Sequence, residues 1–187
     1  MEKTAFLTDQ EIIEASISGN ESAFAEIVRR YESKVAATVF GMLGRCPEAE
    51  DVGQETFVRF FKSMKNFRGE SSVGTYLTRI AMNLSLNELD RRKRQTRVVA
   101  LDDPDFSGKI PGVRAAHEDT NTTEIVHWAV DQLEPKFRSA VVLRMIEGYS
   151  TEETAQILQL PIGTVLSRLS RAKAQLLKLL APYKEQL

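Results

Sequence analysis

The stretch Gly148–Lys173, GYSTEETAQILQLPIGTVLSRLSRAK, constrains the fold more than any other part of the sequence. Ser150 followed by Glu153 forms a capping box, which predicts that a helix begins directly after Ser150. Pro161 interrupts this helix, and because proline is favoured in the first turn of a helix, a second helix is expected to follow it. Two short helices joined by a tight turn are typical of a helix-turn-helix unit.

The second of these helices has two unlike faces. One side is an apolar stripe of Val165, Leu169, Ala172, Leu176 and Leu180. The other side holds small and basic residues without an acidic one, with Arg168 and Lys173 at its borders: Ser167, Ser170, Arg171, Ala174 and Lys178. Small side chains allow close approach to the major groove of DNA, and arginine and lysine reach phosphates and guanine edges. An ordinary helical hairpin with a solvated basic face is the alternative at this point.

Charge is unevenly distributed along a chain whose formal net charge is only −1. Residues 1–58 hold 5 Lys and Arg against 11 Asp and Glu, whereas residues 59–94 hold 9 against 3 and residues 163–184 hold 5 against none. Two basic blocks in a nearly neutral chain favour two separate contacts with a polyanion, with two solvated surfaces as the alternative.

The sequence also indicates the cellular compartment of the protein. A single cysteine, Cys46, excludes an internal disulfide and fits a reducing environment. The N-terminus lacks a secretory apolar segment, and no apolar run approaches the length that crosses a membrane. We therefore expect a soluble, cytoplasmic protein.

Apolar spacing and capping residues predict an all-α fold of two small four-helix domains, residues 1–94 and 124–187. In the first domain we expect helices between Thr8 and Gly19 and over Glu21–Leu43, Pro47–Lys65 and Thr75–Arg94. Residues 95–123 are rich in aspartate, proline and glycine and are interpreted as a flexible linker. The second domain contains the helix-turn-helix unit.

The helix expected over Pro47–Lys65 carries two kinds of surface. A broad apolar arc is assigned to the core: Ala49, Val52, Thr56, Phe57, Phe60, Phe61 and Met64. The other face is an acidic strip with a valine in it: Asp51, Gln54, Glu55 and Val58. Spacings of three, four and seven residues place these four side chains together. An exposed valine among polar groups favours a partner-docking face, although a solvated helix face is the commoner case.

A possible nucleic-acid site follows along the chain. Asn66–Gly74 is polar and glycine-containing, which predicts a loop, and this loop carries Phe67 and Arg68. One edge of the next helix holds Tyr76, Arg79, Asn83, Asn87 and Asp90. Such residues suit single-stranded nucleic acid, because bases stack on aromatic rings and amides bind base edges.

The same helix is expected to close with Arg91, Arg92, Lys93 and Arg94. This cluster is a candidate for phosphate contacts. A cationic cluster that only complements the negative end of the helix dipole is the alternative.

Two segments, in this order, resemble bacterial sigma factors. EDVGQETFVRFFKSMKNFRGESSVGTYLTRIAMN, residues 50–83, resembles their region 2, and LEPKFRSAVVLRMIEGYSTEETAQILQLPIGTVLSRLSRAK, residues 133–173, resembles their region 4. The short chain, with only a linker where a middle domain would lie, is similar to the extracytoplasmic-function (ECF) class of the sigma-70 family. The resemblance implies a non-enzymatic subunit that binds core RNA polymerase and directs promoter recognition, DNA melting and transcription initiation.

The resemblance also implies roles for residues. The strip Asp51, Gln54, Glu55 and Val58 corresponds to the surface for the clamp helices of the largest polymerase subunit. The resemblance implies that one set of residues recognises and opens the minus-ten element and captures a flipped base: Lys65, Asn66, Phe67, Arg68, Tyr76, Arg79, Asn83 and Asn87. It implies that a second set recognises the minus-thirty-five element: Thr164, Leu166, Ser167, Arg168, Ser170, Arg171 and Lys173. Further implied partners are promoter DNA, the polymerase flap region and an anti-sigma factor, often membrane-bound.

Two residues depart from the family pattern. Tyr76 stands where the family usually has tryptophan, and it keeps an aromatic ring. Leu166 stands where several members carry a basic residue. It flanks the expected DNA face, where it would contact a thymine methyl group, so a minus-thirty-five sequence cannot be borrowed from relatives.

Two other classes of function compete with this interpretation. A stand-alone helix-turn-helix regulator would use residues 1–94 as a sensor or dimerisation domain and bind duplex DNA without polymerase. A helical enzyme has little support, because His117 lies in the expected linker, His127 is alone on a helix and Cys46 has no partner. No metal-ligand spacing or phosphate loop is found, so we expect no catalytic residue, metal, cofactor or small-molecule substrate.

Overall fold

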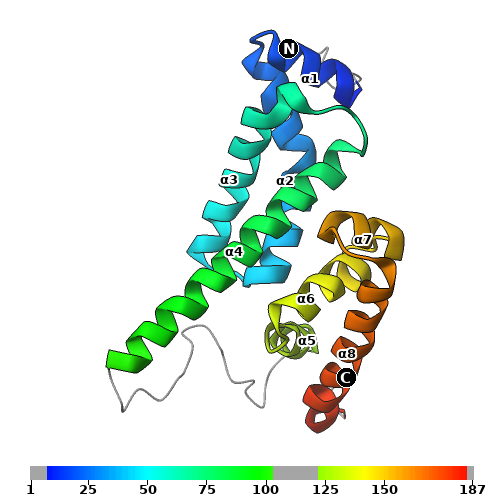
Figure 1. Ribbon diagram of the computed structural model, residues 1–187. Helices are drawn as coiled ribbons and strands as arrows, with labels where there is room; N and C mark the ends of the chain where they lie inside the picture. Colours follow the sequence, from blue (N-terminus) through cyan, green and yellow to red (C-terminus); the bar gives the residue numbers. More distant parts are fainter. Residues whose placement is uncertain (1–7, 103–121, 185–187) are drawn as a thin grey trace.

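The computed structural model describes residues 8–102 and 122–184 (Figure 1). Within these two ranges the chain forms helices joined by short turns and contains no strand, which confirms the predicted all-α fold. His117 and most of the predicted linker, residues 103–121, lie outside the described residues.

The N-terminal helices are α1 (Asp9–Ile17), α2 (Glu21–Leu43), α3 (Pro47–Ser63) and α4 (Val73–Asp102). Helices α2, α3 and α4 pack side by side, and α1 contacts α2 at one end (Figure 1). Capping residues set the helix starts as predicted. Thr8 and Glu11 form a capping box, and the Asn20 side chain accepts a hydrogen bond from the Ala23 amide.

Helix α4 extends further than predicted. We expected it to end at Arg94, but it continues to Asp102. The reason lies in its composition, because residues 95–101 contain neither glycine nor proline and the first proline after Arg94 is Pro104. The start of the segment assigned to a linker is therefore helical.

The C-terminal helices are α5 (Thr122–Asp131), α6 (Pro135–Val141), α7 (Thr151–Leu158) and α8 (Ile162–Leu180). Helix α6 continues into one π-helical turn, η3 (Val142–Ile146), and α8 into one 3-10 turn, η4 (Ala181–Tyr183). The predicted capping box of Ser150 and Glu153 opens α7.

A tight turn separates α7 from α8, as the sequence predicted. Gln159 caps the end of α7 in the left-handed conformation, with φ 53° and ψ 48°. Its amide and that of Leu160 donate hydrogen bonds back to carbonyl groups of α7, at 3.3 Å and 2.9 Å. This backbone reversal fixes the angle between the two helices of the helix-turn-helix unit.

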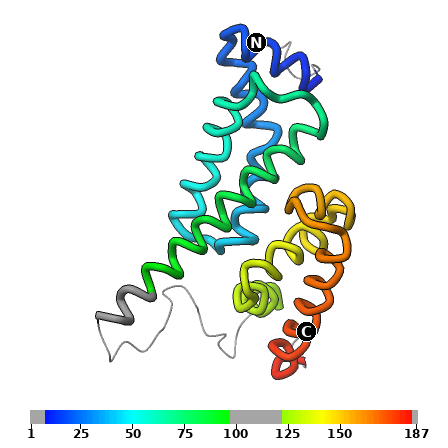
Figure 2. The backbone as a smooth tube through the Cα atoms, viewed as in Figure 1, coloured from blue at the N-terminus to red at the C-terminus, as the bar shows by residue number. Residues whose placement is uncertain are grey.

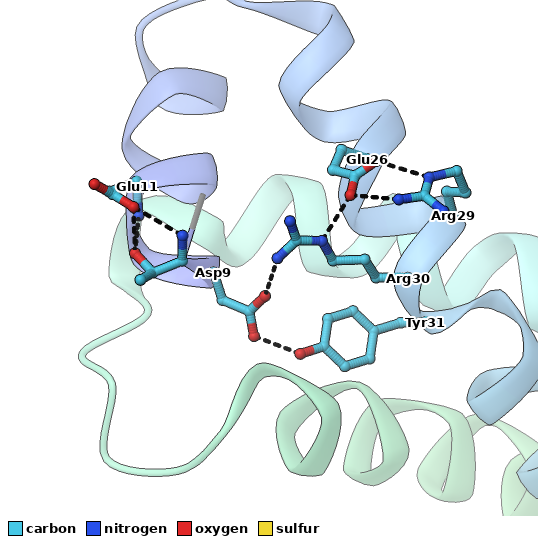
Figure 3. Close-up of polar contacts among 7 residues, drawn as sticks. Asp9, Glu11, Glu26, Arg29, Arg30 and Tyr31 are labelled. Atoms are coloured by element: carbon cyan, nitrogen blue, oxygen red, sulfur yellow. Dashed lines mark hydrogen bonds and ion pairs between the residues drawn. The ribbon is translucent and has the colours of Figure 1, made fainter. Parts of the chain in front are cut away.

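A polar network ties α1 to α2 (Figure 3). Asp9 accepts hydrogen bonds from the Tyr31 hydroxyl and from Nη1 of Arg30, the latter at 3.2 Å. Glu26 accepts bonds from Nε of Arg29 at 2.8 Å and from Nε of Arg30 at 2.7 Å. These guanidinium groups lower the pKa of Glu26 to about 2. Burial, followed by the bond to Asp9, raises the pKa of Tyr31.

The main buried cluster joins the two sets of helices. It contains fully buried residues of α1–α4, among them Ile12, Ile27 and Phe60, and also C-terminal residues: Val142, Leu143, Tyr149 and Ile157. Figure 2 shows the C-terminal helices beside the path of α2 and α4. A second cluster lies within the C-terminal helices, where Ala172 and the half-buried Leu169 and Leu176 confirm the predicted apolar stripe of α8.

One residue of the predicted core arc of α3 lies at the surface. Phe61 is 52% exposed and packs edge-on against Phe24, with ring centroids 4.9 Å apart. Its neighbour Phe60 is fully buried. Successive residues of a helix point about 100° apart, and here Phe60 faces the core while Phe61 turns toward Phe24 at the surface.

Candidate nucleic-acid interface

The predicted loop between α3 and α4 begins with one 3-10 turn, η2 (Met64–Asn66). The Phe67 amide closes this turn by donating to the Met64 carbonyl at 3.1 Å. Gly69 then adopts a φ of 71°, a left-handed conformation that favours glycine. Lys65, Asn66 and Arg68 are exposed, while Phe67 is half-buried.

Three aromatic rings meet beneath this loop. Phe60, Phe67 and Tyr76 pack edge to face, with centroids 5.3 Å apart for Phe67 and Tyr76 and 5.9 Å apart for Phe60 and Tyr76. The Tyr76 hydroxyl donates to Oγ of Ser63 at 3.4 Å. The rings are held by the core on one side, so their orientation is fixed before any ligand arrives.

Arg79 joins this aromatic group. Its guanidinium lies 5.0 Å from the centroid of the Tyr76 ring, one helical turn along α4. A cation held over an aromatic face beside a polar loop can stack on a base and contact a phosphate.

These residues line a cavity of about 590 Å³. Its walls comprise Asn66, Phe67, Arg68, Glu70, Ser71, Thr75, Tyr76 and Arg79, together with Gln156 and Ile157 of α7. The volume lies in the range of pockets that hold small ligands. Most of the predicted minus-ten residues are therefore brought together around one hollow.

Three of the predicted minus-ten residues do not line the cavity. Asn83 and Asn87 are exposed on α4, one and two turns beyond Arg79, so they continue the same edge of the helix. Lys65 is exposed beside the loop. The arrangement is a hollow next to an exposed polar edge of α4.

The four basic residues that follow on α4, residues 91–94, differ in their surroundings. Arg91 bonds Glu88 through Nε at 2.7 Å and Nη2 at 2.8 Å. Arg92 is half-buried and bonds Glu88, Glu48 and the Cys46 sulfur, so it fastens α4 to the start of α3. These bonds, led by the one from Arg91, lower the pKa of Glu88. Lys93 and Arg94 are exposed.

The acidic strip lies on the surface of α3. Asp51 and Gln54 are exposed, Val58 is 42% exposed, and Glu55 bonds Arg59 at 2.9 Å. Phe61 follows Val58 by three residues and extends the strip with a second exposed apolar side chain. No sequence signal marked this position, because the direction of α3 relative to its neighbours decides which of the two phenylalanines is buried.

Helix α8 presents the residues predicted for the minus-thirty-five element. Val165 and Ala172 are fully buried and hold the helix against its neighbours. Exposed side chains follow on the other side: Leu166, Ser167, Ser170, Arg171 and Lys173. Thr164 and Arg168 are half-buried, and Nη1 of Arg168 reaches the Lys136 carbonyl at 3.5 Å.

Residues 8–102 and 122–184 contain no group of three or more His, Cys, Asp and Glu side chains that could hold a metal ion. His127 is exposed on α5, and Cys46 accepts the bond from Arg92 at 3.0 Å. No helix within residues 8–102 and 122–184 is long and apolar enough to cross a membrane.

Two family models match the chain, one on each side of the predicted linker. Residues 27–95 match the family model described as Sigma-70 region 2, and residues 123–176 match that described as Sigma-70, region 4. The cavity residues from the N-terminal helices and the acidic strip lie in the first match. The exposed face of α8 lies in the second.

Curated relatives match over almost the whole chain. The RNA polymerase sigma-H factor of Pseudomonas aeruginosa is 35% identical over 182 residues, which cover 93% of this chain and 94% of the relative. The ECF RNA polymerase sigma-E factor of Haemophilus influenzae is 35% identical over 178 residues, 89% of this chain and 92% of the relative.

Solved structures share the fold. The sigma factor RpoE from Bartonella quintana, in complex with the anti-sigma factor NepR, superposes with a TM-score of 0.67 at 23% identity, covering 84% of this chain and 96% of that one. CnrH, in complex with the cytosolic domain of CnrY, has a TM-score of 0.66 at 25% identity, covering 93% and 97%.

Proposed function

We propose that this chain, which belongs to the extracytoplasmic-function (ECF) class of the sigma-70 family, binds core RNA polymerase and directs it to promoters. In this role the chain recognises two promoter elements, helps to melt the DNA and allows transcription to begin. We place its two functional domains within residues 1–94 and 124–187, on either side of a connecting segment.

The observation that carries the proposal is the cavity beneath the loop after α3. Phe67, Tyr76 and Arg79 surround it inside the segment that matches Sigma-70 region 2. A base flipped out of the minus-ten element stacks there, and Asn66 and Arg68 contact its edge or its phosphate. Asn83 and Asn87 extend the contact along the single strand, with Lys65, Lys93 and Arg94 on the phosphates.

Duplex DNA is bound by α8. Leu166, Ser167 and Ser170 are small or apolar side chains that allow the helix into the major groove, where Arg171 reaches a guanine edge. Thr164, Arg168 and Lys173 flank this face. Burial of Val165 and Ala172 supports the proposal, because it fixes which side of the helix faces outward.

The polymerase is bound by the acidic strip. Asp51, Gln54 and Glu55 supply charge and hydrogen bonds to the clamp helices, and Val58 and Phe61 supply the apolar contact. The flap region of the polymerase is the partner of the C-terminal helices. By analogy with the sigma factor solved in complex with the anti-sigma factor NepR, we also propose an anti-sigma factor as inhibitor, held at the membrane as is common in this class.

The protein on this proposal works in the cytoplasm and is not an enzyme. Its contribution is recognition, because the polymerase forms the bonds of the transcript. Arg92 has a structural role in this scheme, since its charge is already engaged by Glu88 and Glu48.

Transcription reconstituted from purified parts tests the proposal. Core polymerase, a library of genomic fragments and the full chain should give transcripts from a defined set of promoters, and neither protein should do so alone. The variant Asp51→Lys/Glu55→Lys should fold normally, as judged by circular dichroism, yet fail to assemble with core polymerase. A stand-alone regulator would instead bind duplex DNA tightly and specifically without polymerase. Adding it to core polymerase would then leave the transcripts unchanged.

A further inference from the structure

Two exposed apolar side chains lie next to each other at the start of α8. Ile162 is 46% exposed and Leu166 is 54% exposed, and the two positions are about one helical turn apart. Val165 and Ala172, on the other side of the same helix, are fully buried. Ile162 and Leu166 thus turn about half of their surface away from the core.

The surroundings of this pair favour DNA as the molecule that covers it. Residues 163–184 contain five Lys and Arg and no Asp or Glu. The exposed side chains that follow Leu166 on α8 are short or basic, with Ser167 beside it and Ser170 and Lys173 one and two turns further along. A cationic surface attracts a polyanion, and the pair lies at the end of the helix that contacts base edges when a helix-turn-helix binds the major groove.

Thymine carries the only methyl group in the major groove. Each base pair presents hydrogen-bond donors and acceptors there, and thymine adds the methyl group at its C5 atom. The side chains of Ile162 and Leu166 neither donate nor accept hydrogen bonds, so a polar base edge placed against them would lose a partner. The two positions are about 6 Å apart along the helix axis, and neighbouring base pairs are about 3.4 Å apart. The pair can therefore reach two closely spaced thymines.

We propose that Ile162 and Leu166 determine part of the sequence specificity for the minus-thirty-five element, each by packing on the C5 methyl group of one of two closely spaced thymines. This inference rests on the proposed role of α8 in duplex binding. Arg171 on this proposal binds guanine through hydrogen bonds, whereas the Ile162–Leu166 pair excludes water from methyl groups. The hydrophobic effect therefore contributes to the choice of promoter.

Replacing thymine by 2′-deoxyuridine tests this inference, because uracil lacks only the C5 methyl group and still pairs with adenine. Duplexes of random sequence are first selected with the full chain, both together with core polymerase and alone. The thymines of the enriched minus-thirty-five element are then replaced one at a time. Fluorescence anisotropy measures the dissociation constant of each labelled duplex for the wild type and for the variants.

At two positions, loss of the methyl group should weaken binding by the wild type about fourfold, the effect of exposing one buried methyl group. Leu166→Ala should bind the thymine and uracil duplexes equally at one of these positions, and Ile162→Ala at the other. Leu177→Ala is the matched control, because Leu177 is 65% exposed on the same edge of α8. Leu177 lies about 16 Å beyond Leu166 along the helix, so its removal should leave both thymine preferences intact.

Wild-type binding that is unaltered by uracil at every position would overturn the inference. A loss of affinity with uracil that persists in both Leu166→Ala and Ile162→Ala would also overturn it, because the methyl group would then act through DNA shape or through another residue. If Leu166→Ala weakened assembly with core polymerase without changing the response to uracil, the pair would be a protein contact and the inference would be wrong.

These outcomes are separate from those of the transcription test. A chain that directs polymerase to promoters but binds thymine and uracil duplexes equally keeps its proposed function and loses this inference. A chain that shows the predicted uracil effect on duplex DNA, yet never starts transcription, keeps the methyl contacts and loses the role in initiation. If the chain selects no duplex, with or without core polymerase, both proposals are wrong.

Discussion

The two proposed DNA-binding surfaces are built in opposite ways. The minus-ten cavity is lined by rings that pack on one another and on the buried Phe60, so its shape depends on the core. The face of α8 consists of exposed side chains on one helix, whose opposite side packs inward through Val165, Leu169, Ala172 and Leu176. Function and stability are therefore coupled at the first surface and separable at the second.

The strongest test of this contrast is Phe60→Ala. Removing a fully buried phenylalanine from the wall behind the cavity should lower the free energy of unfolding by about 3–5 kcal/mol. Urea denaturation followed by circular dichroism measures this loss. If stability were unchanged, the cavity would not depend on the core as the packing implies.

Tyr76→Ala should reduce promoter melting by the polymerase holoenzyme. Loss of one stacking platform costs about 1–3 kcal/mol of base binding. Permanganate footprinting of the opened minus-ten region measures the effect. Tyr76→Trp is the control, because it keeps an aromatic ring, and it should retain melting.

Arg171→Ala should weaken use of the minus-thirty-five element by about 1–3 kcal/mol if the guanidinium binds a guanine. The urea midpoint should stay at the wild-type value, since Arg171 is exposed. Transcription from promoters with and without that element measures the difference. Lys178→Ala, on the same side of α8 but two turns past Arg171 and outside the proposed contact residues, should have a smaller effect.

The smallest expected effect is a pH dependence of stability at Glu147, which lies near Thr38 and Lys34 of α2. Burial raises the pKa of this carboxyl, although Thr38 and Lys34 oppose the shift. The folded chain therefore binds the proton more tightly than the unfolded chain. Lowering the pH from neutral toward the ordinary value of 4.5 should reduce the cost of burying this group.

Urea denaturation of the wild type and of Glu147→Gln between pH 7.5 and pH 5 measures this dependence. The free energy of unfolding of Glu147→Gln should exceed that of the wild type most at pH 7.5, because the glutamine carries no charge to bury. A difference that grew as the pH fell would contradict the raised pKa of Glu147.

Local signals predicted most of the fold, because capping and helical periodicity depend on neighbouring residues. The capping boxes at Thr8 and Ser150 and the two faces of α8 needed no tertiary information. The end of α4 was missed because the segment after Arg94 changes charge before it meets a helix breaker.

The long-range contacts could not be predicted from the sequence. Nothing in the local pattern indicates that Arg92 bonds Cys46 and Glu48, or that Ile157 lines a cavity with Tyr76. The exposure of Phe61 also required the direction of α3 relative to its neighbours. The predicted cavity residues nevertheless converge, since the loop and the first turns of α4 are adjacent in the chain.

The left-handed turn at Gln159 has a mechanical consequence. It joins α7, which lines the cavity, to α8, which carries the proposed duplex-binding face, through a turn of only three residues. The two helices should therefore move together. On the proposed roles, duplex binding at α8 would alter the cavity and strand binding in the cavity would alter α8, with the same coupling free energy in both directions.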